Sequence, residues 1–190
     1  NHLGLVYLAQ GRYADAEPWL QRAIAAQPMP LPPMMLTDRA NLLNNLAQVA
    51  HGLEDYPRAD TLYAQAIHSR TAKFPDASPD LSTAVYNRAM LAQDRADLPA
   101  ALKLYEQALA IRRKVFNGEH PRIVTALGSV AQVRTLTGDA AGALKIAEEA
   151  AAMSDLTPRE IAMLVPIALA VLWMGIYPES FLAPMRNDVG

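Results

Sequence analysis

The sequence has no cysteine, which excludes disulfide frameworks, thiolate zinc sites and cysteine nucleophiles together. It also lacks an excess of either charge, because 17 lysine and arginine residues stand against 19 aspartate and glutamate residues, giving a formal net charge of −2. A nucleic-acid-binding domain normally concentrates basic residues, so we expect no nucleic-acid partner. The absence of cysteine leaves the compartment open, with the cytoplasm slightly favoured.

Long hydrophobic runs are missing as well. The longest, residues 161–175, contains Pro166 and is shorter than the ~20 residues that cross a bilayer, so it predicts a buried helix and no membrane span. Hydrophobic residues make up 52% of the 190 residues and charged residues 19%, a composition too apolar for disorder and typical of a domain that folds in water. The chain opens at Asn1 without a charged and then apolar leader, which favours a segment of a larger protein.

Short catalytic signatures are absent too. We find no glycine-rich phosphate loop, no HExxH, no GxSxG and no carboxylates at metal-ligand spacing. The four histidines are dispersed along the chain, whereas a metal site needs several converging ligands. We therefore expect no enzyme, no catalytic residue, no metal and no cofactor.

The sequence does contain an internal repeat, with copies that begin at Gly11, Glu54, Ala96 and Gly138. Three columns of this alignment hold mostly small or aromatic residues: Ala16, Ala59, Ala101 and Ala143; Ala23, Ala66, Ala108 and Ala150; Leu20, Tyr63, Tyr105 and Ala147. A matching stretch precedes each copy, with a small residue at Gly4, Ala47, Ala89 and Ala131. Each repeat is therefore predicted to be two amphipathic helices that approach closely at the small residues.

The turns of the repeat carry their own signals. Gly11 and Gly138 stand where a helix must end in a left-handed conformation, and an aspartate lies at or near each following helix start, at Asp15, Asp55, Asp97 and Asp139. Proline and glycine break the helices between repeats, at residues 28–35, 74–80 and 116–121.

These residues resemble the tetratricopeptide repeat family. In the first repeat the residues at the family's spacing are Leu3, Gly4, Tyr7, Gly11, Tyr13, Ala16, Leu20, Ala23 and Pro28. The longer period and the segments 42–47 and 118–131 are similar to the kinesin-light-chain type, which is common also in bacterial proteins. The resemblance implies an all-α fold, a right-handed superhelical solenoid of stacked antiparallel helix hairpins.

The expected organisation is four repeats over residues 1–155, at about 1–35, 36–79, 80–119 and 120–155, followed by a degenerate fifth repeat or C-terminal capping helix at 156–190. A helix is predicted from Thr157 to Trp173, and its apolar surface exceeds one stripe. We expect residues 177–185 or a second chain to cover it, the latter by self-association.

The resemblance also implies that the first helix of each repeat lines a concave groove. The residues predicted to bind a peptide or partner lie on one face of these helices: Asn41, Asn44, Asn45, Gln48, His51, Thr83, Asn87, Met90, Gln93, Ser129 and Gln132. Amides and hydroxyls both donate and accept, which suits a peptide backbone, and Asn45 and Asn87 occupy equivalent places. A merely solvated polar face is the alternative reading.

The groove is expected to be neutral. The family's chaperone-tail binders grip a terminal carboxylate with basic residues, and the corresponding places here hold Asn44, Tyr86 and Thr125. Met90 and Tyr86 are then the expected apolar anchors. The repeat-column tyrosines, Tyr13, Tyr56, Tyr63 and Tyr105, are interpreted as core residues.

Two arginines depart from the family pattern, and a basic cluster stands elsewhere in the sequence. Arg88 and Arg134 fall in apolar columns, so we expect them to be partly buried and to reach the groove or a carboxylate such as Asp94, Asp97 or Glu106. The cluster Arg112, Arg113 and Lys114 is interpreted as a solvated helix end.

The leading functional hypothesis is a protein–protein interaction scaffold that binds a peptide segment or a folded partner in the concave groove, as part of a larger protein. The alternative is a regulatory or sensor array that controls an attached catalytic or DNA-binding domain.

Overall fold

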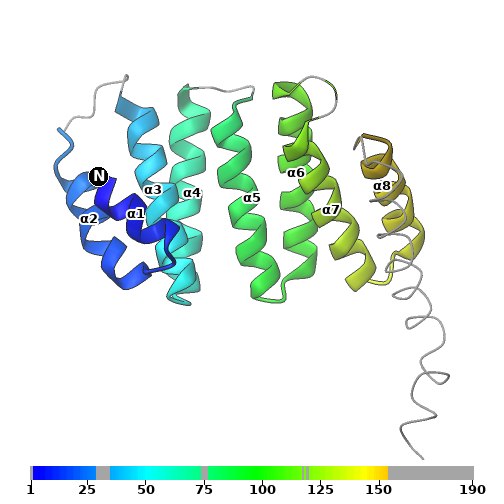
Figure 1. The fold of residues 1–190 in the computed structure, drawn as a ribbon, viewed down its shortest axis with the longest axis horizontal. Helices are drawn as coiled ribbons and strands as arrows, with labels where there is room; N and C mark the ends of the chain where they lie inside the picture. Colours follow the sequence, from blue (N-terminus) through cyan, green and yellow to red (C-terminus); the bar gives the residue numbers. More distant parts are fainter. Residues whose placement is uncertain (1, 29–34, 74–76, 117, 119, 154–190) are drawn as a thin grey trace, which may run out of the picture. The chain divides into compact units, whose positions relative to one another are not determined.

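The computed structural model describes residues 2–28, 35–73, 77–116, 118 and 120–153, and these ranges contain eight α-helices. In chain order the helices are α1 (His2–Ala9), α2 (Tyr13–Ala25), α3 (Leu36–Gly52), α4 (Tyr56–Lys73), α5 (Pro79–Asp94), α6 (Leu98–Val115), α7 (Pro121–Leu136) and α8 (Ala140–Met153). Each helix packs against the next, and the four hairpins stand side by side in chain order (Figure 1). The predicted all-α solenoid of stacked hairpins is confirmed.

The C-terminal expectations, a fifth repeat or capping helix and its cover, lie outside the described residues, as does the apolar run 161–175. The proposed repeat boundaries stay a prediction. No helix within the described ranges is long and apolar enough to span a bilayer.

Capping side chains and prolines fix where the later helices begin. Ser78 accepts a hydrogen bond from Leu81 N at 3.0 Å, and His120 Nδ1 accepts one from Arg122 N at 3.1 Å, each with a proline in the first turn that follows. Asp97 caps α6 in the same way through Ala100 N, at 3.2 Å. Side-chain oxygens and imidazole nitrogens can satisfy amide groups that have no partner inside the helix. His120, expected to be a turn residue, is therefore a helix cap.

The turn inside each hairpin is the same in all four repeats. The last turn of the first helix closes with two backbone hydrogen bonds, for example Gly11 N to Leu8 O at 3.0 Å and Arg12 N to Tyr7 O at 2.9 Å. Gly11 and Gly138 have φ values of 70° and 83°, which confirms the predicted left-handed positions. Glu54 and Ala96 occupy the equivalent places with φ values of 61° and 58°, a conformation that any side chain disfavours.

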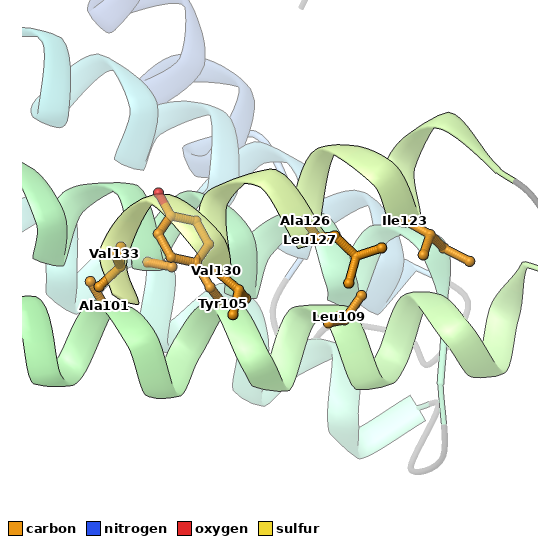
Figure 2. Close-up of a cluster of buried hydrophobic side chains, with 9 residues drawn as sticks. Ala101, Tyr105, Leu109, Ile123, Ala126, Leu127, Val130 and Val133 are labelled. Carbon is orange, nitrogen blue, oxygen red and sulfur yellow. The ribbon is translucent and has the colours of Figure 1, made fainter. Parts of the chain in front are cut away.

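The alanine columns lie where helices cross. Ala16, Ala59 and Ala101 are fully buried, and Ala143 is 7% exposed. In Figure 2 the buried side chains of α6, including Ala101 and Leu109, meet those of α7, including Leu127 and Val133, in the space between the two helices. Small residues at these crossings allow backbones to approach, and the larger neighbours fill the remaining space. Among the described residues the core thus consists of four clusters, in which small and large buried residues pack together.

The basic cluster at the end of α6 is not a solvated face, so that interpretation is wrong for Arg112. Its side chain is only 5% exposed, and Nη1 donates to Arg122 O at 2.6 Å. The guanidinium lies 4.3 Å from the centre of the Tyr86 ring, while Nε is buried without a hydrogen-bond partner. Because burial removes water from the charge, it lowers the pKa of Arg112.

Candidate functional site

A cavity of about 490 Å³ lies where α1, α3 and α5 end and the chain turns into the second helix of a repeat. Three repeats contribute to its lining, which consists of Leu8, Tyr13, Gln48, His51, Gly52, Glu54, Tyr56, Tyr63, Asn87, Met90 and Asp94. This volume falls in the range of pockets that bind a ligand or a side chain of a partner.

Four of the predicted binding residues line this cavity: Gln48, His51, Asn87 and Met90. They come from α3 and α5, the first helices of two successive repeats, as the polar-face pattern predicts. Met90 is 42% exposed, so its thioether is available as an apolar contact.

Asn87 reaches across to the preceding repeat. Its Nδ2 donates to Asn44 Oδ1 at 3.2 Å, which orients both amides and leaves Asn87 Oδ1 as an acceptor. Asn45 is half-buried and makes no hydrogen bond to the described residues. The two asparagines given the greatest weight therefore keep unused hydrogen-bonding capacity.

His51 joins the two repeats through a hydrogen bond with Asp94. His51 Nε2 lies 2.7 Å from Asp94 Oδ2, and the His51 side chain is 17% exposed whereas that of Asp94 is 54% exposed. The imidazole also meets the Tyr56 ring edge-on, with centroids 6.0 Å apart. Because a carboxylate can only accept, Nε2 is the nitrogen that carries the proton in this contact.

The aromatic part of the lining was missed by sequence reasoning. Tyr63 is buried in a core cluster, and the half-buried Tyr13 and Tyr56 pack against core clusters, so the core interpretation is confirmed. Their position in the lining of the cavity was not expected from the sequence. The Tyr13 ring lies so close to Gly52 that a Cβ at that residue would overlap it. The signal available in the sequence was that both Tyr13 and Tyr56 stand directly after a turn, next to exposed helix ends.

Burial raises the pKa of Tyr63, with a smaller contribution from Tyr13, so the phenol is neutral at physiological pH. The two carboxylates of the lining, Glu54 and Asp94, are both exposed. The groove is therefore acidic at this place, which differs from the neutral groove that the sequence suggested.

Other predicted residues are engaged in contacts within the protein. Asn41 Oδ1 accepts from Arg70, Thr83 Oγ1 donates to Pro79 O at 3.0 Å, and Gln93 Oε1 accepts from Tyr105 at 2.9 Å. Ser129 shares a 2.7 Å hydrogen bond with Tyr86. Gln132 is exposed and makes no hydrogen bond to the described residues. None of these five lines the cavity.

Tyr86, the second expected anchor, is also occupied internally. Its hydroxyl meets Ser129, and its ring packs edge-on against Tyr105 with centroids 5.1 Å apart and against the Arg112 guanidinium. We conclude that Tyr86 joins α5 to α6 and α7, and that Met90 is the anchor that remains open.

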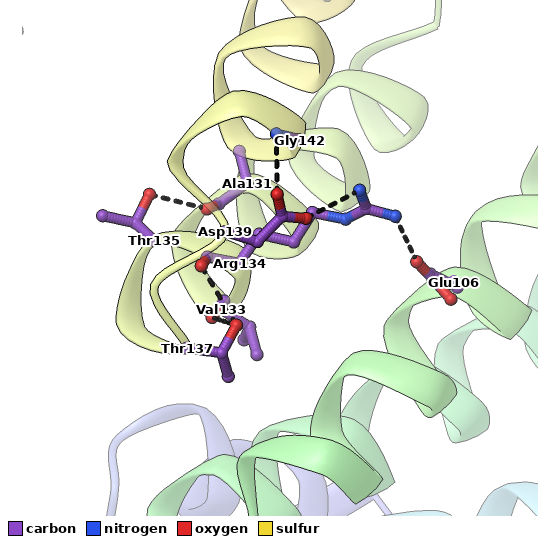
Figure 3. Close-up of polar contacts among 8 residues, drawn as sticks. All are labelled: Glu106, Ala131, Val133, Arg134, Thr135, Thr137, Asp139 and Gly142. Carbon is purple, nitrogen blue, oxygen red and sulfur yellow. Dashed lines mark hydrogen bonds and ion pairs between the residues drawn. The ribbon is translucent and has the colours of Figure 1, made fainter.

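The two arginines in apolar columns do find carboxylates. Arg88 binds Asp60 through Nε at 2.7 Å and Nη2 at 3.2 Å, a partner that was not among those expected. Arg134 binds Glu106 at 2.9 Å and Asp139 at 3.2 Å (Figure 3), so the expectation of Glu106 is confirmed. The contacts of Arg88 with Asp60 and of Arg134 with Glu106 each join two consecutive repeats. None of these residues lines the cavity.

The lining of the cavity carries hydrogen-bonding and aromatic groups. Within the described ranges no three histidine, aspartate or glutamate side chains gather as a metal site would require. The lining offers amides, one imidazole–carboxylate pair, three phenol rings and a thioether, which can hydrogen-bond and pack against a bound chain.

Comparison with known proteins identifies the repeat. One sequence profile described as tetratricopeptide repeat matches residues 80–155, and a second with the same description matches residues 1–27 and 39–80. The chain belongs to the tetratricopeptide repeat family. The resemblance proposed from the sequence is thereby confirmed, and repeats of this family form scaffolds for protein interaction, a class that is generally not enzymatic.

Solved structures with the same arrangement include kinesin light chain TPR-like repeats of Podosopora anserina, at 20% identity and a TM-score of 0.73, with 94% of this chain and 86% of that chain covered. BtubC (BKLC) from P. vanneervenii is similar at 21% identity and a TM-score of 0.57, covering 82% and 80%. The apo form of RapI is similar at 12% identity and a TM-score of 0.72, covering 97% of this chain and 48% of that chain. These low identities show that the chain shares the fold of these repeat proteins.

Two short sequence matches are to proteins of a different kind. NADH-ubiquinone oxidoreductase chain 4 of Chondrus crispus is 50% identical over 32 residues, and that of Marchantia polymorpha is 47% identical over 36 residues. The matches span only 6% and 7% of those proteins, so they carry no statement about the tetratricopeptide array.

Proposed function

We propose that this tetratricopeptide array is an interaction scaffold that binds an extended peptide segment of a partner protein along the first helices of its repeats. The observation that supports this most is the cavity shared by three repeats, because four of the residues predicted from the polar face, Gln48, His51, Asn87 and Met90, line it.

The residues would offer a bound peptide different kinds of contact. Asn87 Oδ1 can accept from a peptide N–H, because its Nδ2 is already committed to Asn44. Asn45 offers a complete amide, and Met90 offers a flexible apolar surface to a side chain of the partner. At about 1 kcal/mol for each net hydrogen bond, a few such bonds and one anchor correspond to roughly micromolar affinity.

Site-specific crosslinking tests the location of the partner. A photoreactive amino acid placed at Met90 should capture a partner segment from the source cell, and mass spectrometry should map the crosslink to a linear stretch of that partner. The matched control places the same amino acid at Gln107, which is exposed on α6, a second helix. Capture from position 107 and not from position 90 would place the partner on the opposite helices and contradict the proposal.

The identified segment then allows a quantitative test. Changing Asn45 and Asn87 together to Ala should weaken its binding by about 1 to 3 kcal/mol in calorimetry, because the ligand backbone loses its amide partners. Circular dichroism should show the same helical content as the wild type. Unchanged affinity with unchanged helical content would contradict the assignment of these asparagines.

A further inference from the structure

The cavity combines negative charge with aromatic rings, a character that the proposed peptide-binding function does not by itself require. Its lining contains the carboxylates of Glu54 and Asp94, and it contains no lysine or arginine. Asp94 Oδ2 meets His51 Nε2, which leaves Asp94 Oδ1 without a partner among the described residues. Glu54 makes no ion pair with the part of the chain that the structure describes. The cavity therefore offers an incoming cation the Glu54 carboxylate and the remaining oxygen of Asp94, whose other oxygen is bound by His51.

Three tyrosine rings accompany these carboxylates. Tyr13, Tyr56 and Tyr63 all line the cavity, and each lies at the start of or within the second helix of a repeat. Tyr63 is only 1% exposed, so the half-buried Tyr13 and Tyr56 are the rings that a ligand can reach. The face of an aromatic ring attracts a cation, and a planar guanidinium can stack on a ring while its N–H groups bind a carboxylate in a forked geometry. A lysine ammonium is a compact, strongly hydrated charge that cannot satisfy both kinds of group in one plane.

The protein provides an internal comparison, because the equivalent positions one repeat further along have a different chemistry. Ala96 stands at the place of Glu54, Leu98 at the place of Tyr56, and Leu136 at the place of Asp94. The hairpins of both repeats fold with the same backbone turn, so the turn itself does not require the acidic and aromatic residues.

The backbone at Glu54 supports the same conclusion. Glu54 has a φ of 61° at a place where the first and fourth repeats have glycine, so a side chain is kept there against conformational preference. Strained positions of this kind are often associated with a functional site. Ala96 shows that the strain alone is tolerated, whereas the carboxylate at Glu54 also reaches the cavity.

We propose that this cavity binds the guanidinium group of an arginine side chain in the partner peptide, held between the Glu54 and Asp94 carboxylates and the rings of Tyr13 and Tyr56. The inference rests on the proposed peptide binding and names the residue that the cavity selects. The charge of the occupant complements that of the lining, and the length of an arginine side chain allows the peptide backbone to remain beside Asn87 and Met90.

The test uses the protein with capped nonapeptides of alanine and serine that differ only at the central residue, which is arginine, lysine, norleucine or glutamate. Methyl and amide NMR signals of Met90, Leu8 and Asn87 report where each peptide binds. The arginine peptide should shift these signals and bind at least about tenfold more tightly than the norleucine peptide, a difference of roughly 1.4 kcal/mol. Its affinity should fall as sodium chloride is raised, whereas that of the norleucine peptide should not.

Glu54→Gly is the decisive variant, because it removes a carboxylate while relieving the left-handed strain. It should weaken binding of the arginine peptide about tenfold without lowering the midpoint of urea unfolding, and it should leave the norleucine peptide unaffected. Ala96→Gly makes the same backbone change one repeat away and should leave both affinities unchanged. Loss of binding in Glu54→Gly therefore cannot be assigned to unfolding.

The outcomes separate this inference from the proposed function. If the four peptides bind this cavity with equal affinity, or the lysine peptide binds as tightly as the arginine peptide, peptide binding stands and the arginine assignment is overturned. If Glu54→Gly binds the arginine peptide as the wild type does, the assignment is likewise overturned. Both proposals fail if two results are negative. None of the four peptides shifts an NMR signal of the cavity in the folded protein, and the partner segment identified by crosslinking at position 90 does not shift one either.

Discussion

The second and third repeats carry the same residue types at two buried positions, yet those residues have different partners. Tyr63 and Tyr105 are equivalent, with 1% and 2% of their surfaces exposed. Tyr105 donates to Gln93 at 2.9 Å, whereas His51, which stands at the place of Gln93 in the second repeat, turns to Asp94. Tyr63 is left to line the cavity. The exchange of histidine for glutamine in this repeat column thus accompanies the change in the partner of the buried tyrosine.

Arg70 and Arg112 show the same contrast. Both stand near the end of a second helix and both are almost fully buried, at 3% and 5% exposure, and desolvation lowers the pKa of each. Arg70 binds Asp80 at 2.7 Å and the side-chain oxygen of Asn41. At the place of Asp80 the next repeat has Arg122, so Arg112 binds a main-chain carbonyl and the Tyr86 ring. Equivalent sequence positions therefore do not imply equivalent electrostatics.

The largest effect is expected when the carboxylate of Arg70 is removed. Asp80→Ala should lower the free energy of unfolding by about 2 to 3 kcal/mol, because it leaves a buried guanidinium with only Asn41. This figure lies below the range for a fully buried pair because Asp80 is 53% exposed and water screens it. Urea unfolding measures the change.

Asp38→Ala is the matched control, since Asp38 holds the equivalent place in the first turn of α3 and is exposed. Both variants lose a favourable interaction with a helix N-terminus, worth less than about 1 kcal/mol, and only Asp80→Ala loses an ion pair. Equal losses in the two variants would show that the contact with Arg70 contributes no stability.

Alkaline pH should lower the free energy of unfolding through the two buried tyrosines, Tyr63 and Tyr105. Burial raises the pKa of Tyr63 and of Tyr105 above 10.0, so above pH 10 the native state retains protons that the unfolded chain releases. Their contribution is fully present below pH 10 and is lost as the pH rises, at up to about 1.4 kcal/mol per pH unit for each tyrosine.

Urea unfolding between pH 9 and pH 11 measures this slope. Tyr63→Phe and Tyr105→Phe should each make it shallower, and the double variant should make it shallower still. At pH 7, Tyr105→Phe should also cost about 1 kcal/mol because Gln93 loses a donor. A slope that neither substitution changes would mean that other groups determine the alkaline unfolding.

Replacing the less compensated arginine should have a smaller effect. Arg112→Met should change the free energy of unfolding by less than about 1 kcal/mol, because loss of the contacts with Tyr86 and Arg122 O is offset by removal of a buried charge whose Nε has no partner. Arg70→Met should lower the free energy of unfolding by more, because Asp80 and Asn41 both lose their hydrogen bonds to the guanidinium. A larger loss for Arg112→Met than for Arg70→Met would reverse the comparison drawn above.

The smallest effect concerns the turn shared by all repeats. Ala96→Gly should raise the free energy of unfolding by about 0.5 kcal/mol, because relief of the left-handed conformation exceeds the added freedom of glycine in the unfolded chain. Thermal unfolding by circular dichroism measures this increase. A decrease would mean that the alanine side chain contributes packing at the turn.

The sequence predicted the helices and turns well because their signals are local. Gly11 and Gly138 marked two left-handed turns, and the alanine columns marked the helix crossings. Glu54 and Ala96 were not recognised as left-handed, although the alignment of the repeats places them opposite those glycines. The backbone is set there by the repeat as a whole, and the local residue preference is overridden.

The candidate site was only partly predictable. The polar face identified Gln48, His51, Asn87 and Met90, because residues on one face of a helix follow from its period. The same rule could not show that Asn41 and Ser129 are occupied by Arg70 and Tyr86, which come from other helices.

The amino-acid sequence by itself determined the helical hairpins, their number within residues 1–153 and the small residues at which they cross, since each depends on spacing along the chain. The tertiary structure decided which carboxylate meets which arginine and where a cavity opens. Tyr13, Glu54 and Asp94 belong to three different repeats, and they line the same cavity because of how consecutive hairpins pack. A single substitution in one repeat can close or open such a cavity in its neighbour, because the interface between repeats is close-packed.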